Sequence, residues 1–366
     1  METPLGPFGS VSGKHSIPRL MWKDLKYLIA YVAPLAAYLG VYMQGAWSFS
    51  GVYVAFVLIP VLDMLTPQSE ANYSQEEERS RLTDRFFDVL LYLNIPLLFG
   101  LIVYYFNTLS EGGLARYEIV GMTLSVGIIV STIGINVAHE LGHRTTRYEQ
   151  GMAKILLLTA LYMHFFIEHN RGHHKNVATD EDPASARLGE TLYAFWLRSV
   201  TGSYRNAWRL ERERLEKKGL PVWGWQNEMV RFTIFQLAYL LAIGLIWGPS
   251  MAGYAVAIAV VGFLLLESVN YIEHYGLRRE KLPNGLYERV SPRHSWNSDH
   301  ELGRIFLYEL TRHSDHHFKA TRKYQVLRHF DDSPQMPAGY PAAILLSLAP
   351  PAWFRVMDKR ALSVRQ

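Results

Sequence analysis

The sequence of 366 residues contains no cysteine. Disulfide bonds, thiolate metal ligands, iron–sulfur clusters and a catalytic cysteine are therefore excluded. Any redox metal must be held by His, Asp or Glu side chains. The first twenty residues also lack the apolar core of a signal peptide. The net charge is only +4 and the apolar residues form long runs, so the basic residues fit membrane-flanking loops and no nucleic-acid partner is expected.

Charged side chains are nearly absent from six long stretches of the chain. A membrane-spanning helix needs roughly 20 mainly apolar residues, with aromatic residues near its ends. The six stretches meet this requirement and lie at about 25–43, 47–65, 89–106, 119–137, 229–247 and 254–271. The sequence therefore predicts an all-α integral membrane protein with six transmembrane helices, in which residues 1–366 form a single membrane-bound domain.

Lys and Arg residues are unevenly distributed between the two sides of these stretches. They are frequent before the first stretch, where Lys14 and Arg19 lie, and in two long segments at 138–228 and 272–338. The connections on the other side carry one cation, Arg116. The positive-inside rule therefore predicts that both termini and the two long segments lie in the cytoplasm.

Eight of the fourteen histidines form three clusters, at 139–143, 169–174 and 313–317, and a ninth, His274, follows the sixth apolar stretch. On a helix, side chains three or four residues apart share one face, so each cluster can direct two or three imidazoles to one point. Neutral imidazole binds iron, zinc, copper and nickel, and nine ligands exceed the roughly four to six that one such ion accepts. The sequence predicts two metal ions bound by His139, His143, His169, His173, His174, His274, His313, His316 and His317.

Acidic residues accompany these clusters. A metal-bound histidine usually donates its second ring N–H to a carboxylate or a carbonyl. We therefore expect four carboxylates to support the ligands, namely Glu140, Glu168, Glu273 and Asp315. Three further acids, Asp180, Glu181 and Asp182, are interpreted as solvated surface groups. No catalytic side chain beyond the metal centre is predicted.

Two other classes of protein must be weighed against a two-metal centre. The segment HELGH at 139–143 has the form of a zinc metalloprotease motif, with Glu140 as general base. A protease needs only three protein ligands and leaves the remaining clustered histidines without a role. A metal transporter is expected to carry histidines and acids within its spans, whereas here the clusters lie at their ends.

The residue sequences of the histidine segments resemble those of a known family. Together they look like the membrane desaturase–hydroxylase superfamily, and most like its AlkB-type alkane 1-monooxygenases. The matching segments are NVAHELGH at 136–143, EHNRGHH at 168–174, NYIEHYGL at 270–277 and RHSDHH at 312–317. The segment at 270–277 is the additional box that separates alkane hydroxylases from fatty-acid desaturases. A membrane fatty-acyl desaturase or hydroxylase is therefore the alternative reading.

The resemblance implies a function that spacing alone does not. Members of the family use two non-haem iron ions and dioxygen to convert the terminal methyl group of a medium-chain linear alkane into a 1-alkanol. One oxygen atom enters the substrate and the other leaves as water. Rubredoxin supplies two electrons, which a rubredoxin reductase takes from NAD(P)H. The resemblance implies a cytoplasmic, helical, histidine-rich di-iron region on a multi-pass protein of the bacterial inner membrane, in contact with membrane lipid.

The electron donor of the family is small and acidic, so a basic surface is expected to receive it. The basic cluster that directly follows the last histidine motif lies nearest the metals. We therefore predict docking at Lys319, Arg322, Lys323 and Arg328.

Overall fold

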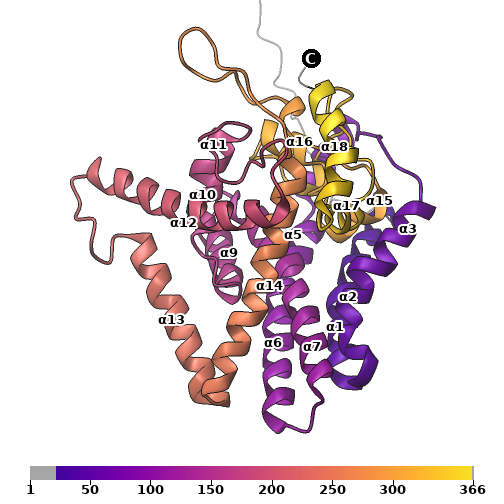
Figure 1. The fold of residues 1–366 in the computed structure, drawn as a ribbon, viewed down its shortest axis with the longest axis vertical. Coiled ribbons are helices and arrows are strands. Elements are labelled where there is room, and N and C mark those ends of the chain that lie inside the picture. The colour runs from indigo at the N-terminus through magenta and orange to yellow at the C-terminus, as the bar shows by residue number, and fades with distance from the viewer. Residues whose placement is uncertain (1–21, 365–366) are drawn as a thin grey trace, which may run out of the picture.

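The computed structural model describes residues 22–364 and is built almost entirely from helices (Figure 1). Extended structure in this part of the chain is limited to isolated bridges, such as that between Gln68 and His300. The all-helical prediction is therefore confirmed. Lys14 and Arg19, which contributed to the predicted orientation, lie outside the described residues.

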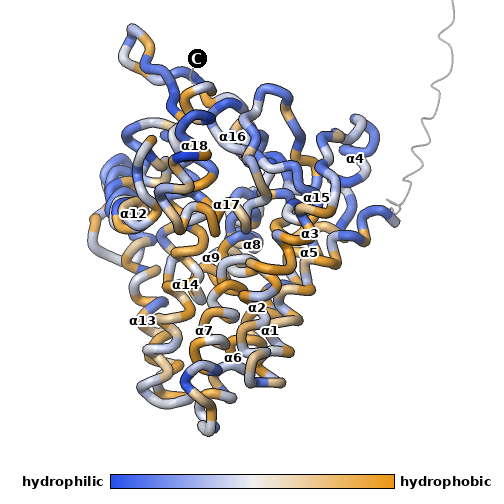
Figure 2. The backbone as a smooth tube through the Cα atoms, turned by 45° about the vertical axis from the view of Figure 1, so that its right-hand side comes forward, coloured by the Kyte–Doolittle hydropathy of each residue, from blue (hydrophilic) through white to orange (hydrophobic). Residues whose placement is uncertain are grey.

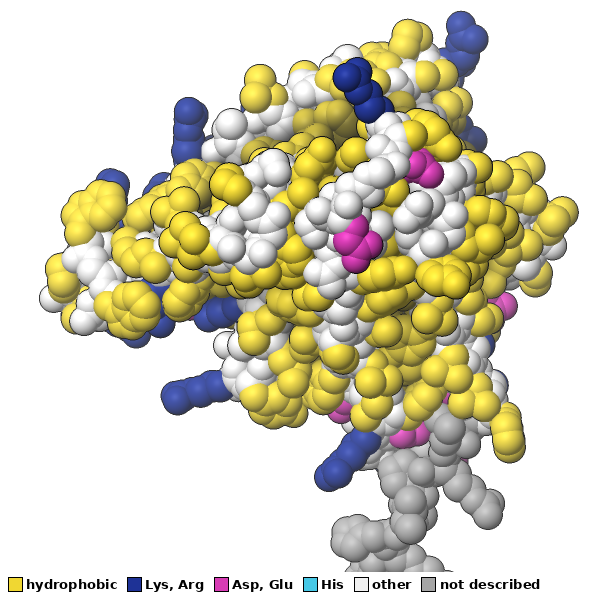
Figure 3. Space-filling model, turned by 90° about the horizontal axis from the view of Figure 1, so that it is seen from below, with side chains coloured by type: hydrophobic (Ala, Val, Ile, Leu, Met, Phe, Trp, Pro, Cys, Tyr) yellow, Lys and Arg dark blue, Asp and Glu magenta, His cyan; other side chains and the backbone are white. Residues whose placement is uncertain are grey.

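Six helical stretches are long and apolar enough to cross a membrane, and each contains one predicted stretch. They are 20 to 27 residues long and comprise Trp22–Met43, Gly45–Leu65, Phe86–Glu111, Arg116–Gly142, Glu228–Trp247 and Pro249–His274. Figure 2 shows that hydrophobic residues dominate these helices, whereas hydrophilic residues gather at the end that carries α16 and α18. Seen from the opposite end, hydrophobic side chains cover most of the surface, with Lys and Arg near its outline (Figure 3). The prediction of six spans is confirmed.

The spans form three hairpins of consecutive elements. The first hairpin contains η1 (Trp22–Tyr31), α1 (Val32–Met43), η2 (Gly45–Phe49), α2 (Ser50–Tyr53), η3 (Val54–Leu58) and α3 (Ile59–Leu65). The second contains α5 (Phe86–Tyr92), α6 (Asn94–Glu111), α7 (Arg116–Ile129), η4 (Val130–Ile135) and α8 (Asn136–Gly142). The third contains α13 (Glu228–Trp247) and α14 (Pro249–His274).

The fourth span, from α7 to α8, is the central one, with 72% of its apolar window buried. It contacts α14 closely because glycines face the partner helix from both sides. A Cβ atom on Gly127 would come within 2.5 Å of Val261, and one on Gly262 within 2.8 Å of Val130. These two helices end in His139 and His274, so their close contact sets the spacing of the predicted ligands.

The remaining helices form a polar region over one end of the spans (Figure 1). They are α4 (Gln75–Thr83), α9 (Arg147–Thr159), α10 (Phe165–Glu168), η5 (His169–His173), α11 (His174–Asn176), α12 (Leu192–Glu216), η6 (Pro292–His294), α15 (Glu301–Phe306), α16 (His313–Phe318), η7 (Tyr324–Val326), α17 (Tyr340–Ser347) and α18 (Pro350–Val364). Helix α12 lies across the ends of the spans, and α13 descends from its far side and meets α14 at the opposite end.

Buried arginines attach this polar region to the spans. Arg81 is 1% exposed, forms an ion pair with Asp24 at the start of the first span, and donates a 2.8 Å hydrogen bond to the Gln325 carbonyl. Arg304 contacts Glu309 at 2.6 Å. Because a buried guanidinium is stable only when its donors are paired, these contacts fix the loops that carry α15 and α16.

Candidate metal centre

The nine predicted histidines come together in two adjacent groups. The first group contains five imidazoles, from His139, His143, His169, His174 and His316, and the second contains four, from His173, His274, His313 and His317. Within each group the candidate ligand atoms all lie within 4.8 Å of one another. Four separate segments contribute, so only the tertiary fold creates the arrangement.

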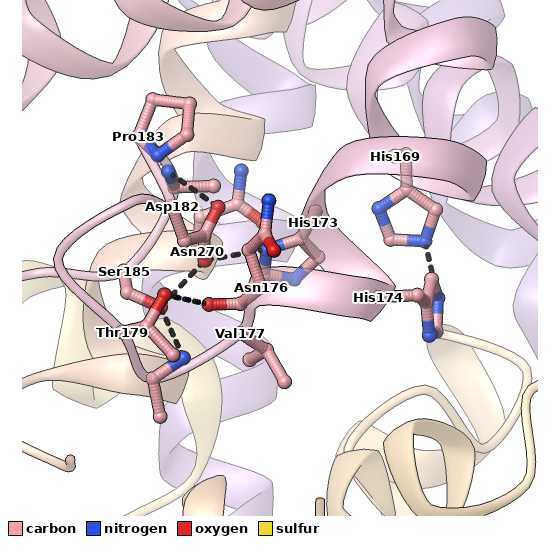
Figure 4. Close-up of polar contacts among 12 residues, drawn as sticks. His169, His173, His174, Asn176, Val177, Thr179, Asp182, Pro183, Ser185 and Asn270 are labelled. Carbon is pink, nitrogen blue, oxygen red and sulfur yellow. Dashed lines mark hydrogen bonds and ion pairs between the residues drawn. The ribbon is translucent and has the colours of Figure 1, made fainter. Parts of the chain in front are cut away.

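The cluster at 169–174 divides between the two groups because its backbone is a π-helix. In η5 the His174 N–H donates to the His169 carbonyl, five residues back. This wider turn brings the Nε2 atoms of His169 and His174 to 2.9 Å, while His173 points away from both, on the side of Asp182 (Figure 4). His173 belongs to the second group. A regular α-helix would instead place His169 and His173 on one face. Single π-turns of this kind occur frequently at functional sites.

The three histidines of the motif at 313–317 are also divided between the two groups. In α16, His313 and His317 are one turn apart and their Nε2 atoms lie 2.9 Å from each other, in the second group. His316 points to the first group, where its Nε2 atom lies 2.9 Å from that of His139. Helix α16 therefore lies between the two groups and supplies ligand atoms to both.

The spacing of the ring nitrogens fits a shared cation in each group. The Nε2 atom of His143 lies 3.1 Å from that of His169 and 3.2 Å from that of His174. Two nitrogens at right angles around an ion, each ~2.1 Å from it, are about 3.0 Å apart. In the second group both ring nitrogens of His274 are buried without a hydrogen-bond partner. Buried polar atoms without partners are rare in proteins, so these nitrogens also fit a metal ligand.

Burial keeps the imidazoles in the state that binds metals. Desolvation lowers the pKa of His143 to about 3, and desolvation with neighbouring histidines lowers the pKa of His316 well below its usual value. Both rings are therefore neutral near pH 7, and neutral imidazole is the ligand form.

His173 has a supporting carboxylate that the sequence interpretation missed. Asp182 is 2% exposed, and its Oδ2 atom lies 2.9 Å from His173 Nδ1 and accepts a 2.6 Å hydrogen bond from Ser185 Oγ (Figure 4). Burial alone would lower the pKa of His173, but the nearby Asp182 carboxylate raises it overall. The interpretation of Asp182 as a solvated surface acid is wrong. Its position nine residues after His173, in the loop that follows α11, was the available signal.

The four carboxylates expected to support the ligands are buried but have different contacts. Glu273 Oε2 lies 3.1 Å from His313 Nε2, on the side of the ring that faces the second group. Glu140 contacts Arg144 at 2.9 Å, Glu168 accepts a 3.1 Å hydrogen bond from Asn206, and Asp315 accepts one of 2.8 Å from the Arg328 N–H. The placement of Glu140 beside Arg144, rather than at the metal-facing nitrogens, does not suit the general base of a metalloprotease.

Four other histidines of the described chain lie outside both groups. His294 contacts Glu288 at 3.1 Å, His329 contacts Asp299 at 2.8 Å, and His300 lies 3.3 Å from Gln68. His164 is buried against Tyr204.

A narrow apolar cavity of about 90 Å³ leads from the histidines into the spans. His139, His313 and Glu273 line it at the metal side, and Gly51 and Ile128 line it within the spans. Ile128 and His139 are eleven residues apart on one helical stretch, which corresponds to about 16 Å along the axis. No Lys or Arg of the described residues lines this cavity.

The four residues predicted to dock the electron donor lie after α16. Three of them have ion-pair partners: Arg322 contacts Asp315 at 3.2 Å, Lys323 contacts Asp88 at 3.2 Å, and Arg328 contacts Glu78 at 2.6 Å. Lys319 is exposed, and within residues 22–364 it has no ion-pair partner within 4 Å.

Comparisons with known proteins agree with the arrangement of histidines. A family model described as fatty acid desaturase matches residues 117–345, which include all nine clustered histidines. The chain is 43% identical over 326 residues to alkane 1-monooxygenase 2 of Pseudomonas aeruginosa, covering 88% of this chain and 86% of the relative. It is 37% identical over 347 residues to an alkane 1-monooxygenase of Pseudomonas putida, covering 93% and 86%. A more distant relative, 27% identical over 341 residues and covering 92% and 89%, is the hydroxylase component of a xylene/toluene monooxygenase of Pseudomonas putida.

Proposed function

Because the chain belongs to the alkane 1-monooxygenases of the membrane fatty acid desaturase family, we propose that it hydroxylates the terminal methyl group of medium-chain linear alkanes. The observation that carries this proposal is the narrow, largely apolar cavity, which ends at His139 and His169 of the first group and at His313 of the second. Dioxygen is the oxidant, and the products are a 1-alkanol and water.

We assign iron to both groups of histidines. His139, His143, His169, His174 and His316 hold one ion, and His173, His274, His313 and His317 hold the other. Bound iron supplies the dioxygen activation and C–H oxidation that imidazole and carboxylate groups alone do not perform. The protein positions the ligands, and Asp182 fixes the ring of His173 by accepting a hydrogen bond from its Nδ1–H group.

The cavity walls select and orient the substrate. An alkane has no charge or hydrogen-bonding group, so only shape and burial of apolar surface can hold it. A narrow channel between spans admits a linear chain along its length and places only its end beside His139 and His313. The absence of a lining Lys or Arg in the described part of the chain disfavours a fatty acid or an acyl-CoA as substrate.

Electrons come from a rubredoxin, which a reductase reduces with NAD(P)H. The cysteine-free sequence cannot itself hold a rubredoxin iron. We propose that rubredoxin docks on the surface that contains Lys319, Arg322, Lys323 and Arg328. Part of the positive charge of this surface is neutralised by Glu78, Asp88 and Asp315. The exposed Lys319 therefore contributes most of the attraction to an acidic partner.

Reconstitution tests the function directly. Purified protein in lipid, supplied with iron, rubredoxin, its reductase, NADH and octane, is expected to form 1-octanol. Incorporation of ¹⁸O from labelled dioxygen distinguishes oxygenation from hydrolysis. Much faster turnover of the matching fatty acid or acyl-CoA would establish the desaturase or fatty-acyl hydroxylase alternative instead.

A further inference from the structure

Helix α13 stands apart from the other spans. Only 17% of its apolar window is buried, the lowest share among the six candidate spans. It meets α14 at the end opposite the polar region and contacts α12 at its other end, and its contacts with α6 and α9 are few (Figure 1). A groove of about 620 Å³ lies between α9 and α13.

Most of the groove is apolar. Ile155 and Leu158 of α9 face Phe235, Ala238 and Tyr239 of α13 across it. Ile155 is 48% exposed and Phe235 is 41% exposed. Water does not cover such surface at the depth of a membrane span, so lipid chains must contact it.

One end of the groove is charged, and positive charge exceeds negative charge there. Lys154 and Arg231 line this end and both contact Glu228, at 2.6 and 3.4 Å. Arg171 joins Glu228 to Glu211, which also binds Arg214 at 2.6 Å. Four cations therefore share two carboxylates, and two positive charges remain uncompensated.

Two polar atoms in the groove wall lack partners. The Arg231 Nε atom is buried without a hydrogen-bond acceptor, and the Tyr239 hydroxyl group is likewise unpaired. A buried guanidinium donor without an acceptor destabilises the protein. An anionic oxygen that accepts a hydrogen bond from this donor would remove that free-energy cost. The charged end also lies at the level of an interface, because Trp223 and Trp225, 77% and 59% exposed, immediately precede α13.

We propose that the groove between α9 and α13 is a binding site for an anionic phospholipid. Its phosphate lies against Arg231 and Lys154, and an acyl chain follows the apolar wall past Phe235 and Ala238. Basic pockets between membrane helices are typical sites for anionic headgroups. The bound lipid fills the space that separates α13 from the body of the protein. The site is independent of the proposed hydroxylation.

Lipid retention tests the proposal. The protein is purified in detergent, and retained lipid is identified and quantified by native mass spectrometry and phosphate analysis. We expect phosphatidylglycerol or another anionic phospholipid to remain bound, and phosphatidylcholine to be lost. Arg231→Gln removes the headgroup contact, and Ala238→Trp blocks the acyl chain without changing charge, so each is expected to reduce retention at least tenfold. Arg212→Gln removes an exposed cation of α12 that does not line the groove, and is expected to retain lipid as the wild type does.

A measurement on the unmodified protein covers the case in which a variant does not fold. Wild-type protein in phosphatidylcholine nanodiscs is titrated with phosphatidylglycerol, and the melting temperature is followed. Saturable stabilisation supports a site. Equal retention of neutral and anionic lipid, unchanged retention in Arg231→Gln, or displacement of the lipid by free alkane would each refute it, the last by identifying the groove as a route for substrate.

Discussion

Single residues decide how the histidines are divided between the two groups. The sequence identifies all nine histidines that the fold brings together, because clustered imidazoles at span ends are a local signal. It does not reveal the division into five and four, because this depends on the π-turn at η5 and on the position of α16 between the groups. If residues 169–174 formed a regular α-helix, His169 and His173 would share one face. In the fold, His169 instead lies beside His174.

This division predicts distinct metal losses. His143→Ala removes a ligand of the first group and His317→Ala a ligand of the second, so each variant should lose mainly one of the two ions and nearly all activity. Metal content measured by mass spectrometry, together with Mössbauer spectra, should show different remaining sites in the two variants. His300→Ala, outside both groups, serves as the control and should retain both ions. Identical residual spectra for the two ligand variants would contradict the division.

Asp182 is not a ligand, but we expect its substitution to change the metal affinity of the second group. Asp182→Asn keeps a hydrogen-bond acceptor for His173 but removes the negative charge, so metal affinity of the second group should fall about 10- to 100-fold. A competition titration with a chelator measures this change. Asp180→Asn is the matched control, because Asp180 is 72% exposed and contacts only Arg278 among the described residues. Equal chelator resistance in both variants would show that Asp182 does not support the metal.

At the scale of helices, apolar length was the most informative property of the sequence. Each predicted span lies within a helical stretch of the fold, because about 20 apolar residues are required for a membrane crossing and this requirement is local. The segment 155–167 was less predictable. Its apolar composition suits one continuous buried helix, but α9 ends at Thr159, Leu161 has a positive φ of 49°, and α10 starts at Phe165. Its apolar composition gives no signal for this turn, which positions His169.

The cavity within the spans predicts a change in substrate length. Ile128 lines the cavity about 16 Å from His139 along the helix, so Ile128→Phe should shorten it and shift the preference toward shorter alkanes. Product formation from a series of alkanes between hexane and hexadecane measures the shift as a ratio of rates. Ile129→Phe changes a neighbouring buried residue that does not line the cavity. If both variants lower all rates in the same proportion, overpacking rather than cavity length is responsible.

At the scale of the whole molecule, the remaining question is which side of the membrane carries the histidines. Both groups of histidines lie at one end of the six spans, which is the end that carries α12 and α16 in Figure 2. An even number of spans puts the two ends of the described residues on the same side. The proposed electron donor, rubredoxin, is reduced through its reductase by NAD(P)H, which is a cytoplasmic reductant. The excess of Lys and Arg in segments 138–228 and 272–338 independently predicts that this end is cytoplasmic.

Cysteine labelling tests that orientation without interfering signals, because the native chain has no cysteine. Ser250 is exposed in the first turn of α14, and this turn lies at the end of the spans opposite the polar region (Figure 1). Asp332 is exposed in the loop between η7 and α17. In intact spheroplasts, a membrane-impermeant maleimide should label Ser250→Cys, whereas Asp332→Cys should react only after lysis. The unmodified protein gives the background, and full labelling of both variants in detergent shows that both thiols are accessible. The reverse pattern would place the metal centre in the periplasm, out of reach of a rubredoxin reduced by NAD(P)H, and would remove the proposed electron donor while leaving the two groups of histidines as they are.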